Sequence, residues 1–173
     1  MNICILPAGA WGTALAIHLS RRGHTVTLVP HTLEEAMEMG ETRENRAFFP
    51  GHPLPPDLQI GFEIKPALME AEVCIIACPS KYLRSVCRTV RGELEAARSL
   101  EIFVTICKGL EEGTNDLPAD VVAAELPDYP RGVLSGPTFA SQVAEGQPSA
   151  LVLASTAGED VTRRLQAAIS AET

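Results

Sequence analysis

The chain has 173 residues, of which 46% are hydrophobic and 21% are charged. This length suits one ordinary domain with a sizeable core, and the composition is that of a globular protein, not of a disordered one. Fourteen Lys and Arg against 22 Asp and Glu give a net charge of −8, which argues against a general nucleic-acid-binding or anionic-membrane-binding surface.

The start of the chain and its cysteines bear on location and metal binding. Met1 and Asn2 lead directly into an apolar run without a basic segment, which does not resemble an export signal, and no apolar run approaches the length of a membrane span. The cysteines are odd in number and lack the paired spacing of metal ligands: Cys4, Cys74, Cys78, Cys87 and Cys107. We therefore expect buried thiols in a cytoplasmic protein, with no bound metal, membrane span or nucleic-acid partner.

Apolar runs of strand length alternate with segments of helical period along the whole chain. In order, the pattern predicts a strand at 3–6, a helix at 11–22, a strand at 25–29, a helix at 33–39, a proline-rich loop at 50–56, a strand at 73–77, a helix at 80–98, strands at 102–106 and 133–134, a helix at 139–145, a strand at 150–154 and a helix at 159–169. Such alternation is typical of βαβ units. The predicted fold class is α/β, with a Rossmann-like, doubly wound and mostly parallel sheet that carries helices on both faces.

The first predicted strand is followed at once by a glycine-containing turn, Pro7-Ala8-Gly9-Ala10-Trp11-Gly12. The turn fits the G-x-G-x-x-G pattern at Gly9 and Gly12. In that pattern the second glycine lets a pyrophosphate approach a helix N-terminus, and the third packs the helix against the strand. Pro7 occupies the first glycine position, where it fixes φ at about −65° and offers no N–H, so it affects cofactor affinity. A plain strand-to-helix turn of small residues is the alternative.

The end of the second predicted strand bears on which dinucleotide would bind. Sites for NAD usually place an Asp or Glu there to hold the ribose hydroxyls, whereas this chain has Val29-Pro30-His31-Thr32 and its nearest acids are Glu34 and Glu35. Such a site would not repel the 2′-phosphate of NADP, to which His31 could donate a hydrogen bond. An ordinary surface histidine fits the spacing equally well. The predicted cofactor is NADP or NAD.

Three later strand ends carry further candidates, because ligands of doubly wound sheets lie at the carboxyl ends of the strands. Pro79 begins a helix and could lie beside a nicotinamide ring. Lys108 could hold a phosphate or polarise a carbonyl, although a solvated loop lysine is the simpler alternative. Gly136 exposes its N–H, and Thr138 offers either a helix cap or a hydroxyl donor to a phosphate or diol.

Together these motifs resemble the amino-terminal domain of NAD(P)-dependent glycerol-3-phosphate dehydrogenases of the bacterial type. The resemblance covers essentially the whole chain, in the family's order. Its elements are Gly9-Ala10-Trp11-Gly12-Thr13-Ala14-Leu15-Ala16, Asn45-Arg46 with Phe49-Pro50-Gly51, Pro79-Ser80, Lys108-Gly109-Leu110-Glu111, Ser135-Gly136-Pro137-Thr138-Phe139-Ala140 and Gly146-Gln147-Pro148.

The resemblance implies reversible hydride transfer between NAD(P)H and dihydroxyacetone phosphate, giving sn-glycerol 3-phosphate for phospholipid headgroups, and a homodimer is an option for the full-length enzyme. It implies that residues 1–173 form the dinucleotide-binding domain. Lys108 would then contact both cofactor and substrate, and Gly136 and Thr138 the substrate. With Gly9, Gly12 and Pro79 from the motifs, the other predicted cofactor contacts are Ala10, Trp11, His31 and Ala140.

The family's helical second domain has no counterpart in the sequence. In the family, that domain carries the acid–base lysine and a Ser-Arg-Asn run, and nothing between Met1 and Thr173 matches either. No catalytic residue is therefore predicted in this chain, and the 173 residues alone are expected to be inactive. The alternatives are a non-catalytic dinucleotide-binding module and the cofactor domain of a related enzyme such as a ketopantoate reductase. Lys108 and the run 135–140 favour the glycerol-3-phosphate dehydrogenase resemblance over the latter.

Overall fold

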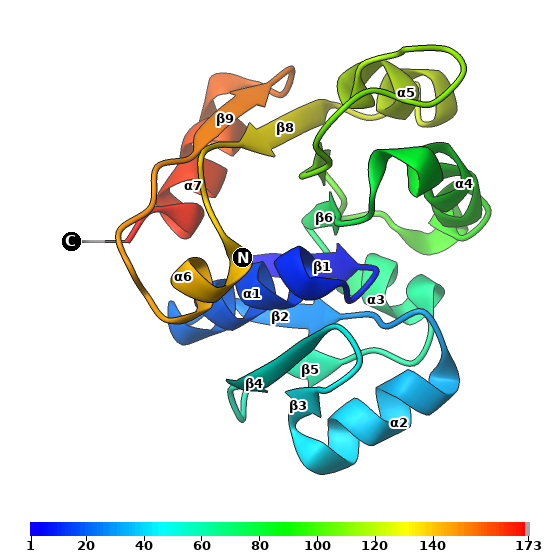
Figure 1. Ribbon diagram of the computed structural model, residues 1–173. Coiled ribbons are helices and arrows are strands. Elements are labelled where there is room, and N and C mark those ends of the chain that lie inside the picture. The colour runs from blue at the N-terminus through cyan, green and yellow to red at the C-terminus, as the bar shows by residue number, and fades with distance from the viewer. Residues whose placement is uncertain (172–173) are drawn as a thin grey trace.

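Strand β1, Asn2–Leu6, shows how the sequence buries both faces of a central sheet. Successive side chains of a strand point to opposite faces. Ile3 and Ile5 pack into one hydrophobic cluster, and Cys4 and Leu6 pack into another. A strand that is apolar at nearly every position therefore lies between two layers of helices. The computed structural model describes residues 1–171 and has this layered architecture (Figure 1).

The sheet has seven strands: β1, β2 (Thr25–Leu28), β5 (Gln59–Ile60), β6 (Val73–Ile76), β7 (Ile102–Thr105), β8 (Arg131–Ser135) and β9 (Val152–Ser155). Their spatial order is β5-β2-β1-β6-β7-β8-β9. All neighbours run parallel except β8 and β9, which are antiparallel. The first strands add to one side of β1, in the order β2 and then β5. After β5 the chain crosses over, and β6 pairs with the other side of β1. This topology confirms the predicted Rossmann-like α/β fold.

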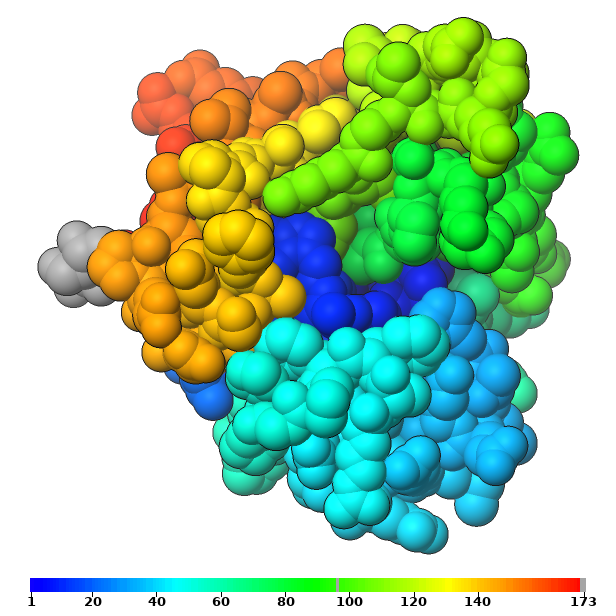
Figure 2. Space-filling view, in the orientation of Figure 1, coloured from blue at the N-terminus to red at the C-terminus, as the bar shows by residue number. Residues whose placement is uncertain are grey.

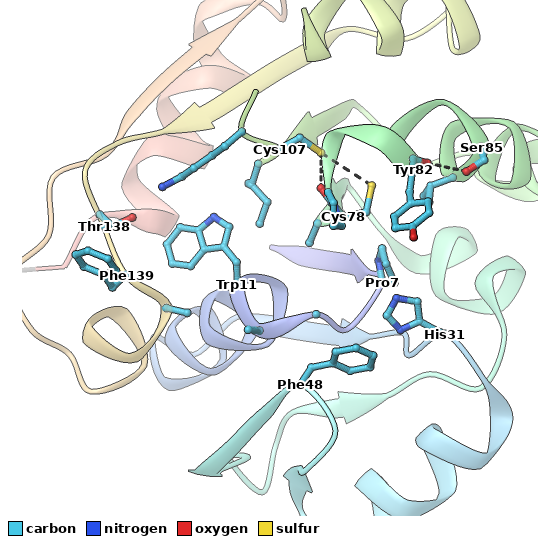
Figure 3. Close-up of a pocket in the computed structure, with 18 residues that line it drawn as sticks. Pro7, Trp11, His31, Phe48, Cys78, Tyr82, Ser85, Cys107, Thr138 and Phe139 are labelled. Atoms are coloured by element: carbon cyan, nitrogen blue, oxygen red, sulfur yellow. Dashed lines mark hydrogen bonds between the residues drawn. The ribbon is translucent and has the colours of Figure 1, made fainter. Parts of the chain in front are cut away.

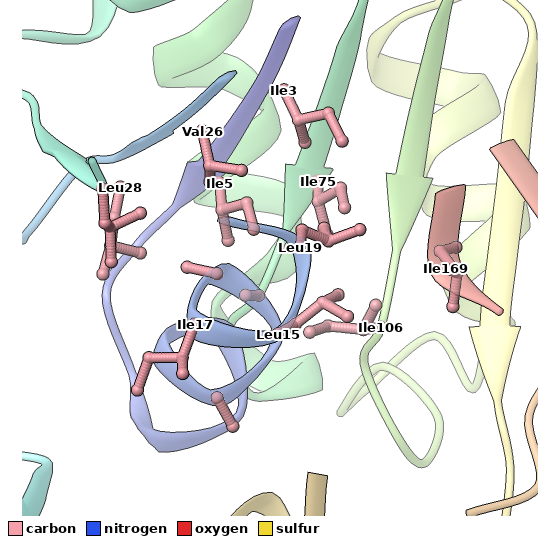
Figure 4. Close-up of a cluster of buried hydrophobic side chains, with 14 of the residues drawn as sticks. Ile3, Ile5, Leu15, Ile17, Leu19, Val26, Leu28, Ile75, Ile106 and Ile169 are labelled. Atoms are coloured by element: carbon pink, nitrogen blue, oxygen red, sulfur yellow. The ribbon is translucent and has the colours of Figure 1, made fainter. Parts of the chain in front are cut away.

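Helices α1 (Ala10–Arg21), α6 (Ala140–Ala144) and α7 (Glu159–Ile169) cover the face that carries Ile3 and Ile5. Leu15 and Leu19 of α1 are fully buried in this layer, and Figure 4 shows them against the isoleucines of the sheet. The four-residue spacing that predicted α1 and α7 therefore corresponds to the side of each helix that meets the strands.

The opposite face is covered by α3 (Ile64–Glu70), α4 (Ser80–Arg91) and α5 (Pro118–Glu125). Leu68, Leu83 and Val121 bring these helices onto the sheet. All five cysteines are buried in this second cluster, as the sequence predicted. Within residues 1–171 no helix combines the length and the apolar content needed to cross a bilayer.

The proline-rich segment was wrongly predicted to be entirely loop. After helix α2 (Leu33–Thr42), strand β3 (Glu44–Asn45) pairs antiparallel with β4 (Phe49–Pro53) in a small separate hairpin. A two-stranded hairpin has only edge strands, where a proline without an N–H disrupts no second ladder. The N–H of Gly51 instead donates to the Glu44 carboxylate at 2.7 Å.

One predicted helix is too long, and two helices were not predicted. The helix predicted at 80–98 ends at Arg91, where Gly92 caps it, and a short 3₁₀ turn, η1 (Leu94–Ala96), follows. Helices α3 and α5 were not predicted, because both are short and their apolar residues cover only about two turns. Pro118 at the first turn of α5 is an available start signal.

Candidate functional site

A cavity of about 860 Å³ lies at the carboxyl ends of β1, β6 and β7, and this volume is within the usual range of small-molecule sites. Figure 2 shows the hollow, with N-terminal residues at its base between the hairpin segment and the segments that follow β7 and β8. Eight of the ten predicted site residues line it: Gly9, Ala10, Trp11, His31, Pro79, Lys108, Thr138 and Ala140. The other two, Gly12 and Gly136, do not line the cavity.

The N-terminus of α1 opens into this cavity. Gly9 is its N-cap in an extended conformation, and within the described part of the chain no side chain caps the helix and no acid lies in its first turn. The first N–H groups of a helix have no intrahelical acceptor and form its positive end. Ala10 and Trp11 present this turn to the cavity, so the geometry suits a bound anion.

Pro7 and Gly12 shape the turn from behind. The N–H of Gly9 donates to the Pro7 carbonyl at 2.8 Å, so this donor closes the turn and leaves anion binding to the helix N–H groups. A Cβ on Gly12 would lie 2.8 Å from the Ala77 Cβ and 3.0 Å from the Pro7 oxygen. Gly12 thus allows α1 to approach β6 closely and makes no contact with the cavity.

A buried asparagine fixes the glycine turn to the hairpin. The Asn45 side-chain amide donates to the Ala8 carbonyl and to Thr13 Oγ1, both at 2.8 Å, and its oxygen accepts the Phe48 N–H at 3.1 Å. Asn45 is only 2% exposed. Its three bonds hold Phe48, a cavity-lining residue that the sequence analysis missed, on the same rigid unit as the first turn of α1.

Replacement of Asn45 by alanine is expected to lower the free energy of unfolding by about 2–4 kcal/mol. Each lost hydrogen bond contributes about 0.5–1.5 kcal/mol, and the groups left buried without partners add a desolvation cost. Urea denaturation checks the value. Arg46→Ala is the matched control, because Arg46 is exposed and contacts only Glu44 at 3.4 Å among the described residues. Equal stabilities for the two variants would contradict this role of Asn45.

An acid does lie beside His31, contrary to what the strand-end sequence suggested. Glu35 accepts the His31 backbone N–H at 2.9 Å, and its carboxylate lies 3.4 Å from Nδ1 of the ring. In return the Glu35 N–H donates to Thr32 Oγ1 at 3.1 Å. The two bonds form a variant of the capping box in which Glu35 reaches the N–H one residue before the N-cap Thr32, and the spacing Thr32-x-x-Glu35 could have revealed it. The His31 ring also packs 5.0 Å from the Phe48 ring, centroid to centroid, on the cavity wall (Figure 3).

The far wall of the cavity comes from the ends of β7 and β8. Lys108 Nζ donates to the Gly136 carbonyl at 3.4 Å. Thr138 is buried, and its hydroxyl has no hydrogen-bond partner among residues 1–171. A buried hydroxyl without a partner is costly, and Thr138 lines the cavity, so a polar ligand atom that reached this hydroxyl would satisfy it. Figure 3 shows Thr138 and Phe139 across the cavity from Pro7 and His31.

The loop after Lys108 is held by an arginine that the sequence analysis missed. Arg84 of α4 makes two parallel bonds to Glu111, at 2.6 and 2.8 Å, and a third to Glu125 at 2.9 Å. The hydrogen bonds from Arg84 and then Thr114 lower the pKa of Glu111 to about 2, so this carboxylate stays ionised at neutral pH. The bidentate geometry fixes the direction in which the chain leaves Lys108.

Residues 1–171 contain no group of three or more His, Cys, Asp and Glu side chains that could hold a metal ion. The arrangement as a whole combines a helix N-terminus, a lysine and an unpartnered hydroxyl around an apolar hollow. It can bind a long anionic molecule that carries both a flat apolar ring and phosphates.

Comparison with known proteins bears on this geometry. Residues 2–161 match the family described as the NAD-dependent glycerol-3-phosphate dehydrogenase N-terminus. The glycerol-3-phosphate dehydrogenase (NAD(P)+) of Rhodospirillum rubrum is 40% identical over 157 residues, which are 91% of this chain and 44% of that protein. The protein of the same name from Thiobacillus denitrificans is 41% identical over 171 residues, which are 98% of this chain and 50% of that protein.

Solved structures give the same result. The glycerol-3-phosphate dehydrogenase of Coxiella burnetii superimposes with a TM-score of 0.88 at 32% identity, over 98% of this chain and 51% of that one. A ketopantoate reductase from Ralstonia eutropha has a TM-score of 0.61 at 18% identity, over 80% of this chain and 42% of that one, which shows a shared fold alone. The chain spans about half the length of the curated relatives it matches. With the match over residues 2–161, these findings confirm the resemblance: the chain belongs to the NAD(P)-dependent glycerol-3-phosphate dehydrogenase family, whose N-terminal part it matches.

Proposed function

We propose that this chain is the cofactor-binding half of an enzyme that interconverts dihydroxyacetone phosphate and sn-glycerol 3-phosphate with NAD(P)H, with residues 1–173 as its dinucleotide-binding domain. The observation that supports this most is a single cavity lined both by the N-terminus of α1, which no side chain caps, and by Thr138, whose hydroxyl has no partner among residues 1–171. On the family resemblance, we further propose a cytoplasmic role in supplying phospholipid precursors.

The residues present fit a nicotinamide dinucleotide. The first turn of α1, at Ala10 and Trp11, would hold its pyrophosphate, because N–H donors and the helix dipole meet there. Pro79 and Ala140 border the same cavity and would contact the cofactor on either side. When bound, the dinucleotide supplies the hydride that reduces a ketone carbon.

The chain's own residues would bind and orient the second reactant. The Lys108 ammonium, held near the Gly136 carbonyl, would attract a phosphate and stabilise negative charge that develops on a carbonyl oxygen. Thr138 would donate its free hydroxyl to the same molecule. The apolar walls formed by Ile106 and Phe139 would exclude water from the reacting atoms.

Binding can be tested directly, because Trp11 is the only tryptophan of the chain and lines the cavity. Titration with NADH or NADPH is expected to quench its fluorescence to saturation. Lys108→Ala should weaken binding about threefold to tenfold, the effect of one charged contact. The exposed Lys65→Ala, on α3, should leave it unchanged. An absence of saturable quenching in the folded chain would contradict the proposed function.

The same titration addresses the choice of dinucleotide. The wild-type chain is expected to bind NADP(H) at least as well as NAD(H), because His31 faces the cavity and can donate a hydrogen bond to a 2′-phosphate. Glu35→Gln removes a negative charge from this region and should improve NADPH binding relative to NADH by about threefold to tenfold. Glu34→Gln, an exposed neighbour on the same helix, is the control. A clear preference of the wild type for NAD(H) would show that the expectation is wrong.

A further inference from the structure

Two cysteine thiols lie side by side at the floor of the cavity. The sulfurs of Cys78 and Cys107 are 4.0 Å apart, and the Cys107 thiol donates to the Cys78 carbonyl at 2.7 Å, as Figure 3 shows. Both residues line the cavity, and each is 6% exposed. The proposed hydride transfer uses neither thiol.

The backbone around this pair is compatible with a direct sulfur–sulfur bond. Cys78 and Cys107 each lie two residues beyond Ile76 and Thr105, the last paired positions of the parallel neighbours β6 and β7. Adjacent strands are about 4.8 Å apart, and disulfides join residues whose Cα atoms are about 4.4–6.8 Å apart. Side-chain rotation can therefore bring the two sulfurs to bonding distance without moving the strands apart.

The other three cysteines supply an internal comparison. Cys4 and Cys74 occupy opposed positions on the neighbouring strands β1 and β6, yet both are 0% exposed and neither lines the cavity. Cys87 is likewise 0% exposed. Burial raises the pKa of Cys74 well above its usual range and that of Cys87 to about 12. The pairs Cys4–Cys74 and Cys78–Cys107 are thus both close in space, but only Cys78 and Cys107 line the cavity.

Within the accessible pair the two thiols differ. A hydrogen bond from Cys78 lowers the pKa of Cys107 to about 7, and a bond with Thr105 acts in the same direction. The hydrogen bond with Cys107, followed by burial, raises the pKa of Cys78. The thiolate is the reactive form of cysteine, so in the reaction proposed below Cys107 attacks first, and the Cys78 sulfur, which lies 4.0 Å away on the same cavity, resolves.

We propose that Cys78 and Cys107 form an oxidisable dithiol site that reacts with hydrogen peroxide entering the cavity. The Cys107 thiolate attacks one peroxide oxygen, the O–O bond breaks, and the departing hydroxide takes up a proton to become water. This leaves a sulfenic acid on Cys107. The Cys78 sulfur then attacks the Cys107 sulfur, the S–O bond breaks, and the hydroxyl leaves as water with the Cys78 proton. Two thiols lose two electrons in total, and one peroxide becomes two waters.

Peptide mapping after hydrogen peroxide treatment of the reduced, folded chain tests this proposal. Trypsin cleaves after Lys and Arg but not at Lys65, because Pro66 follows it, so Cys107 falls in segment 99–108 and Cys78 in segment 47–81 together with Cys74. We expect these two segments to become linked, and to link equally in the Cys74→Ala variant, which assigns the bond to Cys78. The segment that carries Cys4 should stay unlinked.

Single substitutions separate the two chemical steps. Cys78→Ser should leave a sulfenic acid on Cys107 that dimedone traps, whereas Cys107→Ser should leave Cys78 reduced. Cys87→Ala is the matched control and should link as the wild type does. The proposal is overturned if the folded chain forms no Cys78–Cys107 link, or if Cys4 and Cys74 link as fast, because the sealed pair reacts only when the structure opens.

A protection experiment connects this site to the cofactor. A dinucleotide bound in the cavity would cover both sulfurs, an expectation that rests on the proposed function, and saturating NAD⁺ should slow the link severalfold. Link formation that NAD⁺ does not slow would support the dithiol and contradict the placement of the cofactor. The two ideas can therefore fail separately.

Discussion

The 173-residue chain is expected to bind a nicotinamide dinucleotide and yet to reduce dihydroxyacetone phosphate at least about 10²-fold more slowly than a chain extended to the full length of its relatives. Hydride delivery to a ketone develops charge on the carbonyl oxygen, which needs a positioned proton donor worth about 10²–10⁴ in rate. The family resemblance assigns that donor to a lysine outside residues 1–173. Lys108 would still bind the substrate and polarise its carbonyl.

NADPH oxidation by the purified chain, measured beside the extended chain and the extended Lys108→Ala variant, checks this expectation. The extended chain should turn over, and its Lys108→Ala variant should lose most of that activity. Turnover by the short chain near the rate of the extended one would show that a residue within Met1–Thr173 transfers the proton. An inactive extended chain that still binds the dinucleotide would favour a non-catalytic binding module.

The second large effect is expected at Gly136. A Cβ there would lie 2.2 Å from the Ala150 carbonyl oxygen and 3.1 Å from the Leu151 Cα, and these are backbone atoms that cannot turn aside. Gly136→Ala must therefore displace the segment before β9. We expect it to lower the free energy of unfolding by about 3 kcal/mol, at the upper end of the usual cost of overpacking, and to weaken ligand binding through the nearby Thr138.

Urea denaturation of Gly136→Ala beside Gly40→Ala measures this effect. The two variants carry the same chemical change, but no atom lies within 4 Å of a Cβ on Gly40 among the described residues, and Gly40 is inside helix α2. Alanine there should stabilise the chain by up to about 1 kcal/mol. If both variants unfold at the wild-type midpoint, the segment before β9 yields to a methyl group and the tight packing is without consequence.

The sheet and its helical layers could be predicted because their signal is local. Each central strand is a short apolar run, and α7 (Glu159–Ile169) was predicted with its observed ends because Val161, Leu165 and Ile169 repeat at helical spacing. Gly9, Lys108 and Thr138 each follow the carboxyl end of a predicted strand. Because these ends meet at one edge of a parallel sheet, the sequence predicted that the three residues would lie around one site.

Contacts between distant residues could not be predicted in this way. The bonds of Asn45 to Ala8 and Thr13 span 37 and 32 residues, and no periodicity reports such a pairing. The unpartnered hydroxyl of Thr138 and the tight fit at Gly136 likewise depend on where other segments pass. Glu35 is a different case, since the Thr32-x-x-Glu35 pattern that caps its helix is visible in four consecutive residues.

The division of the core into two layers gives the chain two independent reporters of its own motions. All five thiols lie on the side of α3, α4 and α5, whereas the single indole, Trp11, packs against the layer of α1 and α7. Labelling kinetics of the fully buried thiols Cys4, Cys74 and Cys87 therefore monitor the opening of one side of the sheet, and tryptophan emission monitors the other. Comparing the two signals during slow denaturation would show whether the layers separate together or one before the other, without any added label.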